Sequence, residues 1–286
     1  MKQQTLIDVP PTHLFVEPSL KRLRRPVWTE GKAKLIQSYL RLFVMVTHHG
    51  TYIDAFAGPQ EPEKPELWSA KLVLESEPRW LRNFHFFDLD NAQIDLLRQL
   101  VESQPPPSRK EPKRVVQVHR GDCNVEIPKL LSSRRITEKE ATFCLLDQRT
   151  FECHWSTVKA LGEYKKTGHK IELFYFLANK WLPKSIAALT RNPSTAADWW
   201  GRDDWKALRS LSGLERAAAF AKRFKEDLGY ASAKAWPINE RRAGGGSVMY
   251  FMIHATDHRD APILMRRAFE KAVDPTKPAE QLKFLT

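Results

Sequence analysis

Four aspartates follow predicted strands, and this placement is the feature of the sequence that most suggests chemistry. They are Asp54 in "YIDAFAGP", Asp88 in "FHFFDLD", Asp122 in "VHRGD" and Asp147 in "FCLLD". In an open α/β sheet, ligands bind beyond the carboxyl ends of the parallel strands. Carboxylates there can accept hydrogen bonds from hydroxyl groups, attract a cation or take a proton from a reacting group. The sequence therefore predicts an acidic ligand site at one edge of a sheet.

An aspartate after a strand also has a structural role as the N-cap of the next helix. Asp90 and Asp122 directly precede predicted helices, and either could act in this way. Asp88 stands two residues too early for a convenient cap, which favours a role in binding a ribose diol. Gly58 would let the turn after Asp54 approach a ligand closely, because it has no side chain to obstruct the approach.

The glycine motifs that bind phosphate groups are absent. No GxGxxG follows the first strand, and GxxxxGK[ST] occurs nowhere in the chain. A pyrophosphate cofactor is therefore disfavoured, and a nucleoside without phosphate is preferred. S-adenosylmethionine fits this requirement, because it offers a ribose, an adenine and a sulfonium whose positive charge suits an acidic pocket.

Strands alternate with helices over about 130 residues, which predicts a mostly parallel, doubly wound α/β sheet. The parallel strands are expected at 51–56, 83–90, 115–122, 141–147 and 171–177. The segments 234–240 and 247–255 flank a glycine-rich turn and predict a terminal antiparallel hairpin. We expect an extended N-terminal arm over 1–28, a single domain over 29–286 with Thr29 as the first N-cap, and a helical insertion at about 180–230.

The composition indicates a folded, basic protein. Of 286 residues, 42% are hydrophobic, and the formal net charge of +12 favours a polyanionic partner such as nucleic acid, although a basic surface alone can also serve solubility. No apolar run approaches the ~20 residues that span a bilayer, and the N-terminus carries no signal-peptide core, so we expect a cytoplasmic protein. Three irregularly spaced cysteines predict neither a disulfide framework nor a zinc site.

Several segments in order resemble the three-Cys-motif partner protein (TcmP) family, a group similar to class I S-adenosylmethionine-dependent methyltransferases. The resemblance rests on "YIDAFAGP", "FHFFDLD", "GDCN", "LLDQRTFECHWSTVKAL", "IELFYFLANKWL" and "MIHATDH" with "APILM", which together cover roughly residues 30–270. It implies a Rossmann-like, seven-stranded sheet of order 3-2-1-4-5-7-6, with the hairpin as strands six and seven. It also implies a partner protein that carries the three-cysteine motif.

The resemblance assigns roles to individual residues. Those expected at the methionine end of the cofactor are Asp54, Ala55, Phe56 and Gly58. Asp88 would hold the ribose and Leu89 would lie against the adenine, whose edge would meet Asp122 and Cys123. Asp147 would face the site of methyl transfer as the catalytic residue.

Two departures from the methyltransferase pattern leave alternatives open. Motif I reads "AGPQ" without a second glycine, and "DQRT" replaces the "DPPY"-like sequence of amino-methyltransferases. The sequence therefore allows an active methyltransferase acting on nucleic acid, a non-catalytic partner subunit, or a metal-dependent nuclease using Asp54, Asp88 and Asp147. The nuclease is disfavoured, because these acids end different strands.

The polar-aromatic stretch 147–155 is the candidate substrate-binding segment. Arg149 could pair with a phosphate, and Trp155 could stack on a base; the alternatives are a solvated loop residue and a residue packed beneath the following helix. In "HATDH", His254, Asp257 and His258 have weak metal-ligand spacing, and no metal site is predicted. The Trp-rich segment 181–205 is expected to be helix packing, with a substrate-covering lid as the alternative.

Overall fold

The computed structural model describes residues 27–28, 31–108, 111–189, 193–239 and 247–273. Residues 1–26 of the arm expected over 1–28, and the N-cap predicted at Thr29, lie outside these ranges. Within them, no helix is both long and apolar enough to cross a membrane. The cytoplasmic location remains a prediction.

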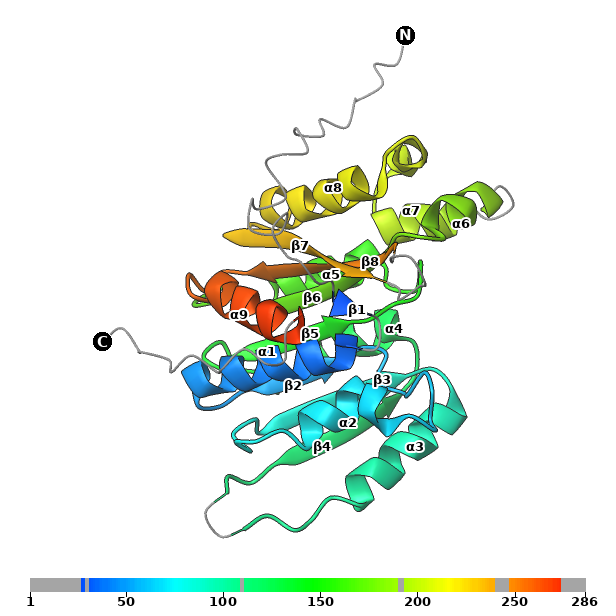
Figure 1. The fold of residues 1–286 in the computed structure, drawn as a ribbon. Helices are drawn as coiled ribbons and strands as arrows, with labels where there is room; N and C mark the ends of the chain where they lie inside the picture. Colours follow the sequence, from blue (N-terminus) through cyan, green and yellow to red (C-terminus); the bar gives the residue numbers. More distant parts are fainter. Residues whose placement is uncertain (1–26, 29–30, 109–110, 190–192, 240–246, 274–286) are drawn as a thin grey trace.

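In the part of the chain that the structure describes, eight strands form one sheet of order β1-β7-β8-β6-β5-β2-β3-β4 (Figure 1). The strands are β1 (Val27–Trp28), β2 (Thr51–Asp54), β3 (Asn83–Asp88), β4 (Val115–Arg120), β5 (Thr142–Leu146), β6 (Glu172–Ala178), β7 (Ser232–Asn239) and β8 (Val248–Thr256). Only β8 runs antiparallel to its neighbours β6 and β7; the other described pairings are parallel. Counted from β2, the order is 3-2-1-4-5-7-6, so the predicted α/β fold of class I methyltransferases is confirmed.

The strand β1 was not predicted. Its two residues belong to the segment 1–28, which the sequence suggests is an extended arm, yet they pair in parallel with Ile238 and Asn239 of β7. The sheet therefore has one short strand more than the seven expected. A two-residue strand carries no period-2 pattern in the sequence, which is why the prediction missed it.

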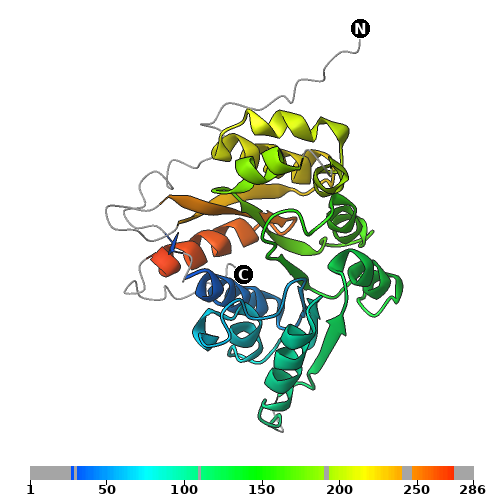
Figure 2. The same ribbon diagram turned by 90° about the vertical axis from the view of Figure 1, so that its right-hand side faces the viewer.

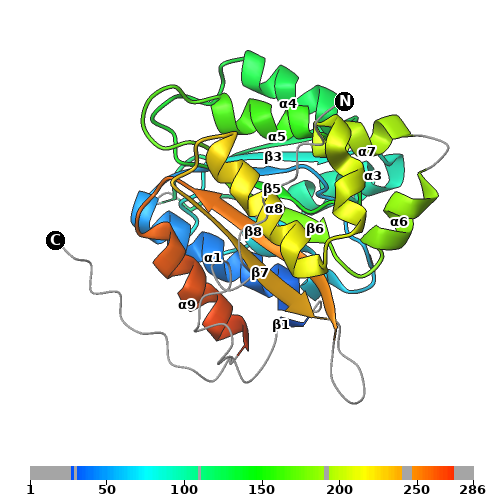
Figure 3. The same ribbon diagram turned by 90° about the horizontal axis from the view of Figure 1, so that it is seen from above.

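Helices cover both faces of the sheet (Figures 1 and 2). One hydrophobic core lies beneath α1 (Lys32–Thr47), α2 (Ser69–Leu74), α3 (Asn91–Glu102) and α9 (Ala261–Val273). Two of these helices, α1 and α9, lie side by side (Figure 3). The other core lies beneath α4 (Cys123–Ser132), α5 (Trp155–Glu163) and the helices between β6 and β7. Strands β2, β5 and β6 are buried along their whole length because of this double cover.

The insertion predicted at about 180–230 consists of α6 (Leu182–Ala188), α7 (Pro193–Trp200), the 3-10 helix η5 (Asp203–Arg209) and α8 (Gly213–Glu226). Its tryptophans Trp199, Trp200 and Trp205 are buried in the core. Ser212 begins α8 with a capping box, in which its hydroxyl accepts from the Glu215 N–H and the Glu215 carboxylate accepts from the Ser212 N–H. This packing matches the helix-packing interpretation of the tryptophans.

Candidate active site

The candidate site lies where the strand order reverses, between β2 and β5. From β2 the chain adds β3 and β4 on one side and then crosses to β5 and β6 on the other. Asp54 ends β2, and Asp147 directly follows β5. Both line a cavity of about 250 Å³, whose walls include Phe56, Trp68 and Tyr250. A crevice at such a switch point is the usual ligand site of an open α/β sheet.

Asp54 is buried and lines this cavity. Its carboxylate accepts hydrogen bonds from the Tyr52 hydroxyl at 2.9 Å and from the Phe56 N–H at 3.2 Å. Burial raises the pKa of Asp54 from 3.8 to about 7; the two hydrogen bonds oppose this shift, and the charges of Asp147 and Asp88 add to it. A carboxyl group with a pKa near neutrality can change its protonation state when a ligand binds.

Asp147 forms an ion pair with Lys32, the first residue of α1. The Lys32 Nζ lies 2.9 Å from Asp147 Oδ1 and 2.7 Å from Oδ2, and both side chains are about nine-tenths buried. The same ammonium lies over the rings of Phe176 and Tyr250, 5.1 and 5.2 Å from their centroids. Burial raises the pKa of the Tyr250 hydroxyl to about 12, and the charge of Asp147 adds to the shift. A cation thus fixes the predicted catalytic carboxylate within the cavity.

Asp88 lies against the turn that contains Gly58. The Gly58 N–H donates to Asp88 Oδ2 at 3.0 Å, and the Asp90 N–H donates to Oδ1 at 3.0 Å. A Cβ atom at residue 58 would meet Asp88 Oδ2 at 2.6 Å and Gln93 Cβ at 2.6 Å. Gly58 is therefore required because this turn packs closely on β3 and α3. The sequence had instead suggested that this glycine allows the close approach of a ligand.

The residues around Gly58 fit a ribose. A carboxylate offers about four lone-pair directions, and Asp88 uses one on each oxygen for a backbone N–H. Next to it, Gln93 Oε1 is buried and accepts no hydrogen bond from the described residues. Buried polar atoms are normally paired, so an acceptor without a donor at this point suits a ligand hydroxyl.

The other residues assigned to the cofactor, Ala55, Leu89, Asp122 and Cys123, do not line the cavity. Ala55 is buried and donates its N–H to the Leu145 carbonyl at 3.0 Å, which holds β2 to β5. Leu89 is 71% exposed beside Asp88. Asp122 caps α4 by accepting from the Asn124 N–H at 2.8 Å, and Cys123 lies in the core. Asp90 likewise caps α3.

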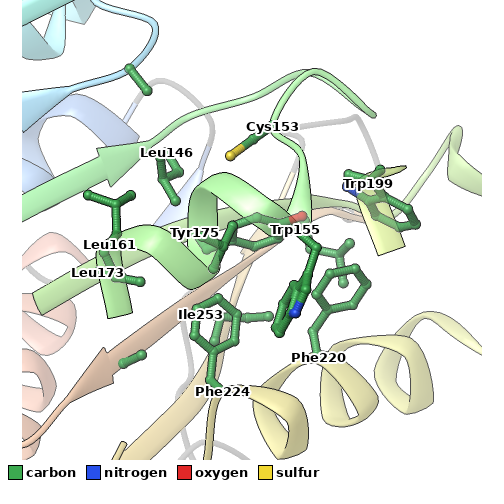
Figure 4. Close-up of a cluster of buried hydrophobic side chains, with 14 of the residues drawn as sticks. Leu146, Cys153, Trp155, Leu161, Leu173, Tyr175, Trp199, Phe220, Phe224 and Ile253 are labelled. Carbon is green, nitrogen blue, oxygen red and sulfur yellow. The ribbon is translucent and has the colours of Figure 1, made fainter. Parts of the chain in front are cut away.

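The proposed stacking of Trp155 on a base does not fit its position in the structure. Its ring is buried, and the Arg223 guanidinium lies 3.7 Å from its centroid. Phe220 and Phe224 meet the ring edge-on, as Figure 4 shows. No free ring face remains for a nucleobase, and the packing alternative describes this residue.

Arg149 lies near the cavity, whereas His254 and Asp257 of "HATDH" bond to other parts of the chain. Arg149 is exposed, and its charge acts on the nearby Tyr250 hydroxyl, so it lies beside the cavity. His254 is buried in β8 and bonds to Glu172, whereas Asp257 accepts from the Ala231 N–H. In the described part of the chain, no three His, Cys, Asp or Glu side chains are grouped to hold a metal ion.

Sequence reasoning missed several residues of the cavity, above all Lys32, Trp68 and Tyr250. Lys32 is one of 46 basic residues, and nothing in its neighbours distinguishes it. Trp68 donates its indole N–H to the Ala57 carbonyl at 2.6 Å and so holds together the segment between β2 and α2. The one signal for Lys32 was its position in the first turn of the helix that precedes β2.

No family model and no curated protein matches this sequence. Among solved structures, the chain is similar to the DszA carbon methyltransferase, with 16% identity and a TM-score of 0.45, over 76% of this chain and 52% of that one. It thus spans about half the length of that structure. It is also similar to a SAM-dependent methyltransferase from Anabaena variabilis ATCC 29413, with 10% identity and a TM-score of 0.35, over 83% of this chain and 98% of that one. These similarities are low, and the fold assignment rests on the strand order.

Proposed function

We propose that the protein is an S-adenosylmethionine-dependent methyltransferase. The observation that carries the proposal is the grouping of strand-end carboxylates at the switch point of the sheet. Asp54 and Asp147 line one cavity there, and Asp88 lies against the Gly58 turn at its side. Carboxylates suit both a ribose diol and a cationic sulfonium, and the site lacks the glycine-rich cradle that a pyrophosphate would need.

Different residues would contact different parts of S-adenosylmethionine. Asp88 would accept hydrogen bonds from the ribose hydroxyls, with Gln93 Oε1 as a further acceptor and exposed Leu89 beside the adenine. Asp54 would face the amino-acid end, where a bound ammonium group would favour its ionised form. S-adenosylmethionine supplies a methyl group activated on its sulfonium. The chain's own contribution is to hold that group and the acceptor in line within a walled cavity.

Asp147 is the proposed catalytic residue. It lies at the end of the strand next to Asp54, and a carboxylate there could take a proton from the acceptor as the acceptor is methylated. Lys32 would act as a positioning residue, because its ammonium holds both oxygens of this carboxylate. The acceptor is proposed to be a nucleic acid, on the basis of the net charge of +12 and the exposed Arg149 beside the cavity.

A specific observation favours a second candidate, a non-catalytic subunit that supports a three-cysteine-motif protein. Each candidate carboxylate already has partners within the chain: Tyr52 and Phe56 for Asp54, the turn amides for Asp88, and Lys32 for Asp147. Carboxylates that are paired within the chain could stabilise the fold without taking part in methyl transfer. A nuclease is not favoured, since the described acids do not group around one metal position.

Methyl transfer distinguishes these candidates. Purified protein would be incubated with S-adenosylmethionine labelled in its methyl group and with total RNA, DNA and a protein extract, and label would be counted in each polymer. We expect label in nucleic acid that falls at least ~100-fold in Asp147→Asn, since general-base removal costs about that much. The matched control Asp95→Asn changes an exposed carboxylate on α3 and should retain activity. Binding of the cofactor without label in any polymer would favour the subunit.

A further inference from the structure

A second cavity, of about 300 Å³, lies at the opposite edge of the sheet from the candidate active site. It opens at the amino ends of β5 and β6, between α1 and α9, the two helices that lie side by side in Figure 3. Its apolar wall includes Phe43, Val46 and Leu264. Nothing in the proposed methyl transfer uses this cavity.

Glu172, the first residue of β6, supplies a buried acid to this cavity. Its Oε1 accepts from the Tyr39 hydroxyl and lies 3.0 Å from His254 Nε2, and its Oε2 accepts from the Thr256 hydroxyl at 2.9 Å. All four side chains are buried, and Tyr39 and Thr256 line the same cavity. Apart from His254, no cationic group of the described chain lies within ion-pair distance of Glu172. The carboxylate is thus rigidly held but lacks a permanent cation.

Lys165, just beyond α5, supplies a buried base to the same cavity. Its side chain is almost fully buried, and its ammonium donates to the Glu140 carbonyl. No carboxylate within the described ranges forms an ion pair with it, although an ammonium has three N–H donors. Burial lowers the pKa of Lys165 to about 8, while the more distant carboxylates of Glu140 and Glu138 oppose the shift. These two carboxylates are held by other groups, Glu140 by Thr51 and Glu138 by the Lys166 and Thr167 N–H groups.

We propose that this second cavity binds an amino-acid-sized zwitterion with an apolar side chain. Buried charges in proteins are normally paired, yet Glu172 and Lys165 line one cavity without pairing with each other. An α-ammonium group would complement Glu172, an α-carboxylate would complement Lys165, and the side chain would contact Phe43, Val46 and Leu264. The cavity volume suits a ligand of this size, because small-molecule pockets begin at about 300 Å³. The proposal does not depend on the methyltransferase assignment.

Binding would be measured by isothermal titration and by the thermal midpoint of the full chain, without S-adenosylmethionine. The probes are L-valine, L-leucine, L-methionine and L-phenylalanine, with isopentylamine and 4-methylpentanoate as the two halves of leucine. We expect at least one amino acid to bind and to raise the midpoint. Because each half lacks one charge-assisted interaction, isopentylamine and 4-methylpentanoate should bind at least ~10-fold more weakly than leucine if leucine binds.

Variants distinguish binding in the cavity from nonspecific binding. Lys165→Met should weaken binding at least ~10-fold, whereas Lys166→Met, an exposed neighbour, should leave it unchanged. Val46→Phe narrows the cavity without touching either charge and should also weaken binding. The proposal is overturned if none of the four amino acids binds up to tens of millimolar, if both halves of leucine bind as well as leucine, or if folded Lys165→Met binds as the wild type does.

Discussion

The Lys32 ammonium lies 2.7 Å from a carboxylate oxygen of Asp147, although 115 residues separate the two in sequence. The pair joins the first turn of α1 to the end of β5 within the candidate active site. Because both side chains are about nine-tenths buried, removing one leaves the other charge with little solvent. Breaking the pair by removing one partner is therefore expected to destabilise the fold as well as to release Asp147 from its position.

We expect Lys32→Met to lower the free energy of unfolding by about 3 kcal/mol, since it leaves a buried carboxylate unpaired. Urea denaturation at pH 7.5 measures this change. Lys64→Met breaks an exposed ion pair with Glu61 and should leave stability nearly unchanged, because solvent screens such a pair. The double variant Lys32→Met/Asp147→Leu should recover much of the loss. Equal effects of the two lysine substitutions would contradict the expected penalty for leaving the buried Asp147 carboxylate unpaired.

Asp54 gives a pH dependence with a defined sign. Its pKa is about 7 in the folded protein and 3.8 as the ordinary value, so between pH 4 and 7 the folded state holds a proton that the unfolded chain has released. Stability from this group is therefore lost as pH rises through that window, by up to about 4 kcal/mol. Relative to wild type, Asp54→Asn should gain stability from pH 4 to pH 8. Denaturation curves of both proteins at each pH measure the difference, and parallel pH profiles would contradict the shifted pKa.

Gly58 is predicted to be essential for cofactor binding. The added Cβ of Gly58→Ala would meet Asp88 Oδ2 and Gln93 Cβ, both at 2.6 Å, and would push Asp88 from the proposed ribose position. We expect affinity for S-adenosylhomocysteine to fall at least ~10-fold, the equivalent of one lost charge-assisted hydrogen bond.

The control for Gly58 is Gly168→Ala. Gly168 has a φ of 73°, and its nearest atom to an added Cβ is 3.8 Å away. This variant carries backbone strain but lies at the other edge of the sheet, so it should lose some stability and retain cofactor affinity. Unchanged affinity in folded Gly58→Ala would remove this turn from the site.

Trp155 is predicted to stabilise the fold. Its ring packs between Arg223 and the aromatic side chains of α8, so Trp155→Ala should cost about 4 kcal/mol of unfolding free energy. Trp80→Ala, at a tryptophan that is 36% exposed, should cost less than about 1.5 kcal/mol. Thermal and urea unfolding compare the two. A Trp155 variant of wild-type stability would support a surface role for this side chain.

The sheet could be predicted from sequence because each central strand is an apolar run bounded by turn residues. The strand ends also placed Asp54 and Asp147 at one edge, since parallel strands end together. The packing between elements could not be predicted in the same way. Lys32, Arg223 and Glu172 acquire their roles from partners more than twenty residues away, through burial that no local pattern encodes.

Because local sequence patterns do not encode packing between elements, some residues have roles in the structure that differ from those predicted. A tryptophan after a strand has the same sequence appearance whether it packs under a helix or faces a ligand, and at Trp155 the stacked Arg223 decides for packing. In the sequence, Asp122 and Asp88 differ only in their distance to the next helix. In the structure, Asp122 caps α4, whereas Asp88 accepts a hydrogen bond from the Gly58 N–H.

Isothermal titration of S-adenosylmethionine and S-adenosylhomocysteine tests the central claim most directly. The account predicts binding to the wild type, at least ~10-fold weaker binding to Asp88→Ala through loss of the ribose contacts, and unchanged binding to Asp95→Ala. Circular dichroism of each sample would verify that it is folded. The absence of binding heat at several temperatures, in a folded wild type at high concentration, would contradict an S-adenosylmethionine site in this protein.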